Sequence, residues 1–215
     1  MNESEKLSSE LKDIRQMMER SSRFISLSGL SGISAGICAL TGAWLSSDII
    51  EKNKNAVRNL KVSIADADSI IYGDFINSWL FRIAFLTFVA ALVSAFIFTY
   101  RRSKKTNVPI WGNTAKRLII NVTVPVITGG IFLLALIKNG VFGFVAPGCL
   151  IFYGLGVLNA SKYTLPETRY LAYGEILLGL LTLFFMGYGL YFWALGFGVF
   201  HIIYGVFMWL KYERN

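Results

Sequence analysis

Charged residues are scarce in this chain: only 16% of its 215 residues are Asp, Glu, Lys or Arg, against about 25% in an ordinary soluble domain. Hydrophobic residues make up 54% of it. This composition excludes a soluble globular fold, and it also excludes a disordered chain, which needs low hydrophobicity and high charge. Two cysteines are too few to hold a disulfide scaffold together. The composition predicts an integral membrane protein.

Histidine and the common catalytic signatures are also scarce or missing. His201 is the one histidine, whereas haem in a helical bundle needs two axial ligands and zinc needs three or four ligands. Cys38 and Cys149 stand apart in apolar runs, where cysteine is a small packing residue. The sequence contains no phosphate-binding glycine loop, no nucleophile elbow between a strand and a helix, and no HExxH motif. We therefore expect no metal, no cofactor and no enzymatic activity.

Long apolar runs dominate what is present. A helix that crosses the hydrocarbon core needs about 20 mostly apolar residues. Six such runs occur, at residues 24–45, 78–100, 118–137, 141–159, 170–190 and 191–210. They are continuously apolar and lack the alternation of a membrane β-barrel. We therefore predict an all-α fold, a bundle of six transmembrane helices within residues 24–210.

Two reversals of the chain are expected from glycine. Residues 170–210 form one apolar stretch of roughly forty residues, twice the length of one span, so this stretch must fold back on itself. Gly187 to Gly189 is the expected turn, because glycine adopts the backbone angles that a tight reversal requires. Asn139 and Gly140 are expected to turn the chain between the third and fourth spans.

The basic residues predict an orientation. Fifteen of the 21 Lys and Arg residues fall before the first span, in the 101–117 loop, after the fourth span and in the 211–215 tail. Only five fall in the loops on the other side. Basic loops stay in the cytoplasm, so we predict that both termini are cytoplasmic in a bacterial inner membrane. The charges form short clusters rather than one basic face, so nucleic acid is not an expected partner.

Three segments are expected outside the membrane. Residues 1–23 are too charged for a signal peptide, and their apolar positions recur with helical spacing. They predict a short amphipathic cytoplasmic helix that lies on headgroups or on the protein itself, with a contact to a second copy or a partner as the alternative. The outside loop 46–77 is too small for its own core. It is expected to extend the first two spans as helical stubs joined near Asp66 to Asp68, and a ligand-binding role is a minor alternative.

The 101–117 loop carries six basic residues and no acid. We expect it to hold the anionic headgroups of cytoplasmic lipids. The expected contacts are Arg101, Arg102, Lys104, Lys105, Lys116 and Arg117. A second copy or another membrane protein is the other partner that this sequence allows.

Three ionisable side chains fall inside the predicted spans, and each is a functional candidate because charge is costly in hydrocarbon. Arg82 lies near the outer face, where it is expected to reach the headgroups or Asp74. Glu175 and His201 lie on helix faces that also carry small residues, so both are expected to face other helices.

Glu175 lies roughly 7 Å and His201 roughly 13 Å from the cytoplasmic ends of adjacent antiparallel spans, a difference that long side chains, helix tilt or one water molecule can bridge. Their pairing has two interpretations: a hydrogen-bonded clasp between spans five and six, or a proton-carrying site, since histidine changes its charge near neutral pH. The second interpretation predicts a cavity open to the cytoplasm around this pair. Its other expected members are Tyr204, Asn159 and Lys162.

The first span is rich in small residues. Ser28, Gly32 and Gly36 are four residues apart, the pattern of close helix packing in membranes. We therefore expect this span to pack tightly inside the bundle.

Two resemblances accompany these predictions. The run Gly29-Leu30-Ser31-Gly32 resembles the GxSG motif of rhomboid intramembrane proteases, which implies Ser31 as nucleophile and His201 as base. The chain departs from that family because Ser31 lies on the first span and the supporting histidine of the second span is missing. Residues 159–167 and 196–205 resemble small bacterial six-span membrane proteins, which implies the architecture and no activity.

Three functions follow in order of expectation. The first is a membrane protein of accessory, regulatory or sensory type that acts through helix and partner contacts. The second is a small proton-linked transporter or channel that uses Glu175 and His201. An intramembrane enzyme is a distant third. The first predicts a sealed polar pair, and the second predicts a polar cavity that reaches it.

Overall fold

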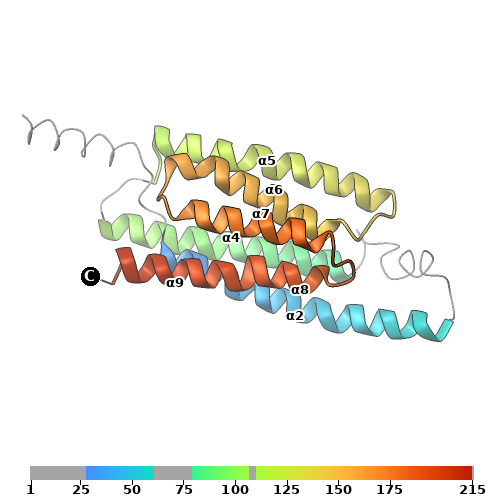
Figure 1. Ribbon diagram of the computed structural model, residues 1–215. Helices are drawn as coiled ribbons and strands as arrows, with labels where there is room; N and C mark the ends of the chain where they lie inside the picture. Colours follow the sequence, from blue (N-terminus) through green and yellow to red (C-terminus); the bar gives the residue numbers. More distant parts are fainter. Residues whose placement is uncertain (1–27, 61–78, 107–109, 215) are drawn as a thin grey trace, which may run out of the picture.

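The computed structural model describes residues 28–60, 79–106 and 110–214 (Figure 1). Every regular element in these ranges is helical, which confirms the all-α prediction for this part of the chain. The long helices are α2 (Gly29–Leu60), α4 (Trp79–Thr106), α5 (Asn113–Lys138), α6 (Val145–Ala160) and α7 (Thr168–Thr182). A 3-10 turn, η2 (Ser161–Tyr163), follows α6. The predicted amphipathic helix, the predicted joint between the helical stubs near Asp66 to Asp68, and Asp74 lie outside the described residues.

The chain ends in one continuous helix built from three pieces. These are α8 (Gly189–Trp193), the π-helical segment η3 (Ala194–Phe200) and α9 (His201–Tyr212). We call them together the last helix. A π-helix has wider turns than an α-helix and is frequent at functional sites.

Four helical segments are long and apolar enough to cross a membrane: Gly29–Lys52, Trp79–Thr106, Asn113–Lys138 and Gly189–Tyr212. The protein is therefore a membrane protein. The helices α6 and α7 have 16 and 15 residues, which rise only about 22 to 24 Å, less than the roughly 30 Å of hydrocarbon. The apolar runs around them are longer than the helices, because the backbone leaves the helix at residues 141–144 and 183–188.

Both expected reversals are present. The helix α5 ends in a Schellman motif, in which the Val141 N–H donates to the Leu136 carbonyl (2.9 Å) and Gly140 has φ +75°. Residues 170–210 fold back as predicted, and Gly187 lies in that turn with φ +96°. The turn is longer than expected, because α7 ends at Thr182 and the next helix begins at Gly189.

The helices form two groups of three. In the first group, α2 packs between α4 and the last helix. In the second group, α6 packs between α5 and α7, and Figure 1 shows α5 and α2 at opposite edges of the bundle. The last helix contacts α6 and α7 as well as α2, so it joins the two groups. We call the place where it meets α6 and α7 the junction.

Glycines set the contact between α2 and the last helix. A Cβ atom built on Gly205 would lie 2.5 Å from the Ile33 nitrogen and 2.6 Å from the Gly29 carbonyl oxygen. One built on Gly36 would lie 2.6 Å from the Gly198 carbonyl oxygen. Backbone therefore packs directly on backbone, as the small residues of the first span predicted.

Candidate functional site

The junction holds two of the ionisable residues predicted inside the spans. Glu175 comes from the middle of α7 and is fully buried (0% exposed), while His201 is the first residue of α9 and is also buried. The His201 Nδ1 atom lies 3.4 Å from the Glu175 Oε1 atom. The structure thus brings Glu175 and His201 into contact between α7 and the last helix.

The π-helical segment explains how the two side chains meet. His201 follows η3 directly, and its Nδ1 atom lies 3.1 Å from the carbonyl oxygen of Gly196, five residues earlier. Gly196 also makes room for the carboxyl group, because a Cβ atom there would lie 2.5 Å from the Glu175 Oε2 atom. A residue larger than glycine at position 196 would displace Glu175.

A third residue of the junction is Tyr153 on α6, which the sequence did not predict. Its hydroxyl lies 2.7 Å from the His201 Nε2 atom. Its ring packs on Phe197, with ring centroids 5.0 Å apart, and Phe197 in turn stacks on His201. The position of Tyr153 in an apolar run carried no signal beyond its hydroxyl.

The carboxyl group of Glu175 has unused hydrogen-bonding capacity. Among the described residues, neither Oε1 nor Oε2 has a hydrogen-bond partner, although the side chain is fully buried. Most buried polar atoms in proteins are hydrogen-bonded, so each exception calls for an explanation.

The other predicted members of this site lie elsewhere. Tyr204 is one turn beyond His201, and its hydroxyl lies 3.0 Å from the Thr168 Oγ1 atom. Asn159 faces α5 instead and donates to the Asn121 carbonyl oxygen (3.3 Å), while Lys162 is exposed. The polar cluster of the junction is therefore Glu175, His201 and Tyr153, without Tyr204, Asn159 or Lys162.

Ser31 does not pair with His201, contrary to what the GxSG resemblance implies. The Ser31 hydroxyl donates to the carbonyl oxygen of Ser28, within its own helical turn. Both ring nitrogens of His201 have other neighbours, Tyr153 at Nε2 and Gly196 with Glu175 at Nδ1.

Arg82, the third ionisable residue predicted inside the spans, lies near the start of α4. It is exposed and lies over the Trp79 ring, 5.1 Å from its centroid.

A second polar cluster, near the C-terminus, ties three helices together. The Glu213 carboxylate accepts hydrogen bonds from the Gly29 backbone N–H, from the Ser28 hydroxyl (3.1 Å) and from the Arg102 guanidinium (2.9 Å). It therefore caps the start of α2 and holds the end of α4. This cluster was not predictable from the sequence, because Ser28, Arg102 and Glu213 lie far apart along the chain.

Arg102 accordingly differs from the other predicted lipid contacts. Its side chain is only 9% exposed and forms an ion pair with Glu213. The remaining five, Arg101, Lys104, Lys105, Lys116 and Arg117, are exposed.

Glu167 forms a further contact at the same end. This residue precedes α7, and its carboxylate accepts hydrogen bonds from Lys211 and from the Tyr212 hydroxyl (2.9 Å). Burial raises the pKa of the Glu167 carboxyl, but the hydrogen bonds from Lys211, its own backbone and Tyr212 outweigh burial and hold the pKa below its ordinary value. The contact therefore favours the charged form of Glu167.

The Glu167 contact predicts a pH dependence of stability. A carboxyl whose pKa is depressed on folding stabilises the protein above its ordinary pKa, and this contribution is lost as the pH falls through the folded-state value. We expect the thermal midpoint in detergent to fall between about pH 6 and about pH 3, and less so in Glu167→Gln. Asp48→Asn, which alters an exposed ion pair with Lys52, is the control. An equal slope in wild type and Glu167→Gln would contradict the prediction.

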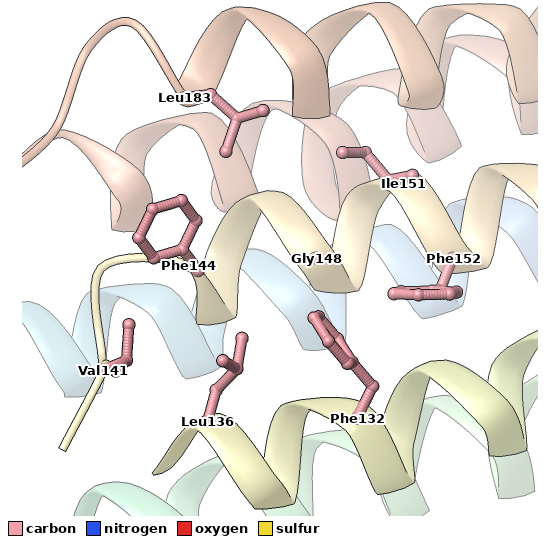
Figure 2. Close-up of a pocket in the computed structure, with 8 residues that line it drawn as sticks. All are labelled: Phe132, Leu136, Val141, Phe144, Gly148, Ile151, Phe152 and Leu183. Carbon is pink, nitrogen blue, oxygen red and sulfur yellow. The ribbon is translucent and has the colours of Figure 1, made fainter. Parts of the chain in front are cut away.

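An apolar groove of about 330 Å³ lies between α5 and α6, near the ends joined by the Gly140 turn (Figure 2). Its lining consists of Phe132, Leu136, Val141, Phe144, Gly148, Ile151, Phe152 and Leu183. None of these is polar or ionisable, and none belongs to the junction. The groove therefore offers hydrocarbon contact and no polar route to Glu175.

The junction combines a buried carboxyl, an imidazole and a phenol, three groups that are able to hold or exchange a proton. It draws one residue from each of α6, α7 and the last helix, so its state bears on the contact between the two helix groups. No protein-family model, curated protein or solved structure matches this chain.

Proposed function

We propose that this chain is a six-span protein of a bacterial cytoplasmic membrane, of accessory, regulatory or sensory type, which acts through contacts between helices. The short helices α6 and α7 support the count of six, because they pack against the long α5 and against the last helix. A membrane crossed by the four long helices would surround them too.

The exposed basic residues support cytoplasmic termini. They flank the connection between α4 and α5, and the ion pair of Arg102 with Glu213 brings this end of α4 beside the C-terminus. By the positive-inside rule this end faces the cytoplasm. A reporter fused after Arg214 is then expected to be active only as a cytoplasmic fusion, and one inserted between residues 61 and 78 only as an external fusion. The reverse pattern would overturn the orientation.

The closed junction is the observation that carries the accessory or sensory function. Glu175 is fully buried and both His201 nitrogens have neighbours. The groove between α5 and α6 is wholly apolar. Transport through these residues would need a polar path from the aqueous phase, since ionisable groups on such paths line water-filled cavities. A closed polar contact suits a protein that changes or reports the arrangement of its helices.

The helix α4 supports a role in partner contacts. Its main neighbour is α2, and its other faces expose large apolar side chains such as Phe85, Phe88, Leu92 and Phe96. Such a helix has room for lipid or for a helix of another membrane protein.

A small proton-linked transporter is the second candidate, favoured by the unpartnered oxygens of Glu175. Proton flux into liposomes, followed with an enclosed pH-sensitive dye, separates the two. We expect wild type and the double variant Glu175→Gln, His201→Ala to be equally inactive under an imposed pH gradient. Flux in wild type that the double variant lacks would reject the proposed function in favour of transport.

A further inference from the structure

We infer that Glu175, His201 and Tyr153 form a proton-binding site, and that the closed junction is its neutral form, with the proton on Glu175. This inference deepens the sensory part of the proposed function, on which it rests, by naming the proton as the ligand.

The neighbours of His201 fix the position of one ring hydrogen. The Gly196 carbonyl oxygen, 3.1 Å from Nδ1, is only an acceptor, so Nδ1 carries a hydrogen. At the other nitrogen, the Tyr153 hydroxyl is 2.7 Å from Nε2, where it is able to donate to the lone pair of a neutral ring or to accept from an imidazolium. A neutral imidazole with hydrogen on Nδ1 therefore satisfies the ring and the phenol together.

The surroundings of Glu175 favour its protonated form. A carboxylate in an ion pair with imidazolium would be expected about 2.7 to 2.9 Å from the nitrogen, but Nδ1 lies 3.4 Å from Oε1. No described group donates a hydrogen bond to either oxygen. An ionised carboxylate would therefore be buried without compensation, which costs far more than burying a neutral carboxyl group.

The packing on the Oε2 side of the Glu175 carboxyl group favours a proton as the ligand. Gly196 lies against Oε2, since a Cβ atom there would be 2.5 Å from Oε2 and 2.5 Å from Leu150 Cδ2. A metal ion or a water molecule needs space between these atoms, whereas a proton needs none.

Few other titratable groups face the site. On α6, Cys149 lies one turn before Tyr153, and on α9 the Tyr204 hydroxyl is engaged with Thr168. The helix α2 approaches His201 through glycine, with Gly32 near the His201 carbonyl oxygen. Among the described residues, the ionisable group that pairs with Glu175 is His201, so these two side chains set the charge of the site.

The closed junction is then stable only while Glu175 carries its proton and the His201 ring is neutral. Loss of the proton leaves a carboxylate beside a neutral imidazole, and a second proton leaves an imidazolium beside a neutral carboxyl. Either charge is buried and unpaired, and either is relieved when α7 moves away from the last helix and water enters. Proton binding thereby controls the contact between the two helix groups.

The single histidine makes the test direct. Protein labelled with ¹⁵N-histidine and reconstituted in nanodiscs gives the imidazole signals of His201 alone, without assignment. We expect a neutral ring with hydrogen on Nδ1 at neutral pH. In the infrared spectrum we expect the carbonyl band of a buried protonated carboxyl group, which Glu175→Gln removes. Asp48→Asn, at an exposed carboxyl, is the control and keeps that band.

The outcomes separate this inference from the proposed function. An imidazolium signal at neutral pH, with no protonated carboxyl band, would show an ion pair and overturn the inference. A ring that titrates as freely as in water between about pH 5 and pH 8 would also overturn it, because the site would then be open. The histidine signal comes from unmodified protein, so it stands even if Glu175→Gln folds poorly. The proposed function is contradicted instead by proton flux through wild-type protein in liposomes or by reporter fusions that show the reverse orientation.

Discussion

Gly205→Ala is expected to lower the free energy of unfolding by about 3 kcal/mol, the upper part of the range for overpacked sites. The added methyl group would meet backbone atoms of Ile33 and Gly29 at 2.5 and 2.6 Å. Backbone cannot rotate away as a side chain does, so α9 and α2 must separate along their contact. The loss spreads to the van der Waals contacts that hold membrane helices together.

Gly130→Ala is the matched control for this substitution. Gly130 lies inside α5, where an added Cβ atom meets nothing within 4 Å. Alanine is the better helix former by about 1 kcal/mol, so this variant is expected to be as stable as wild type or more so. Unfolding by SDS titration, followed by circular dichroism, compares the two. Equal stability of both variants would show that α2 and α9 are not in close contact.

Glu213→Ala is expected to have a similarly large effect, about 3 kcal/mol, because breaking a largely buried ion pair is strongly destabilising. The Glu213 and Arg102 side chains are only 14% and 9% exposed. The variant also removes the acceptor for the first N–H group of α2 and for Ser28. The start of α2 and the end of α4 should therefore loosen together, which hydrogen exchange of these two segments measures.

Asp48→Asn is the control for Glu213→Ala. Asp48 forms an ion pair with Lys52, but their side chains are 66% and 73% exposed. Exposed pairs contribute about 0 to 1 kcal/mol, so little change is expected. Glu213→Gln keeps the side-chain shape and one acceptor, and it should fall between wild type and Glu213→Ala. A Glu213→Ala protein as stable as Asp48→Asn would mean that the C-terminus does not hold the two helices.

Helices and reversals were predictable because they depend on local sequence. Apolar run lengths identified the helices, and Gly140 and Gly187 marked the places where the backbone turns with positive φ. The lengths of α6 and α7 were not predictable in the same way. Hydropathy counts side chains, and the apolar residues 141–144 and 183–186 continue the runs after the backbone has left the helix.

The junction was predictable only in part. The cost of burying charge in the membrane, and the small residues on their helix faces, pointed to Glu175 and His201. The structure brings these two side chains into contact. Tyr153 was not predictable, because its role depends on the register of α6 against the last helix. That register depends on the π-helical segment at Ala194–Phe200, and a 3.6-residue periodicity does not reveal its extra backbone per turn. The Glu213 cluster likewise depends on tertiary pairing.

The packing of α2 on α9 has a consequence for synthesis. Gly29 and Gly205 are 176 residues apart in the chain, and a ribosome needs about 9 to 35 s to add that many residues. During this time the glycine face of α2 and the site filled by Glu213 await the last helix to be made. A chain stalled before α9 would display the glycine face of α2 to the membrane with no helix packed on it.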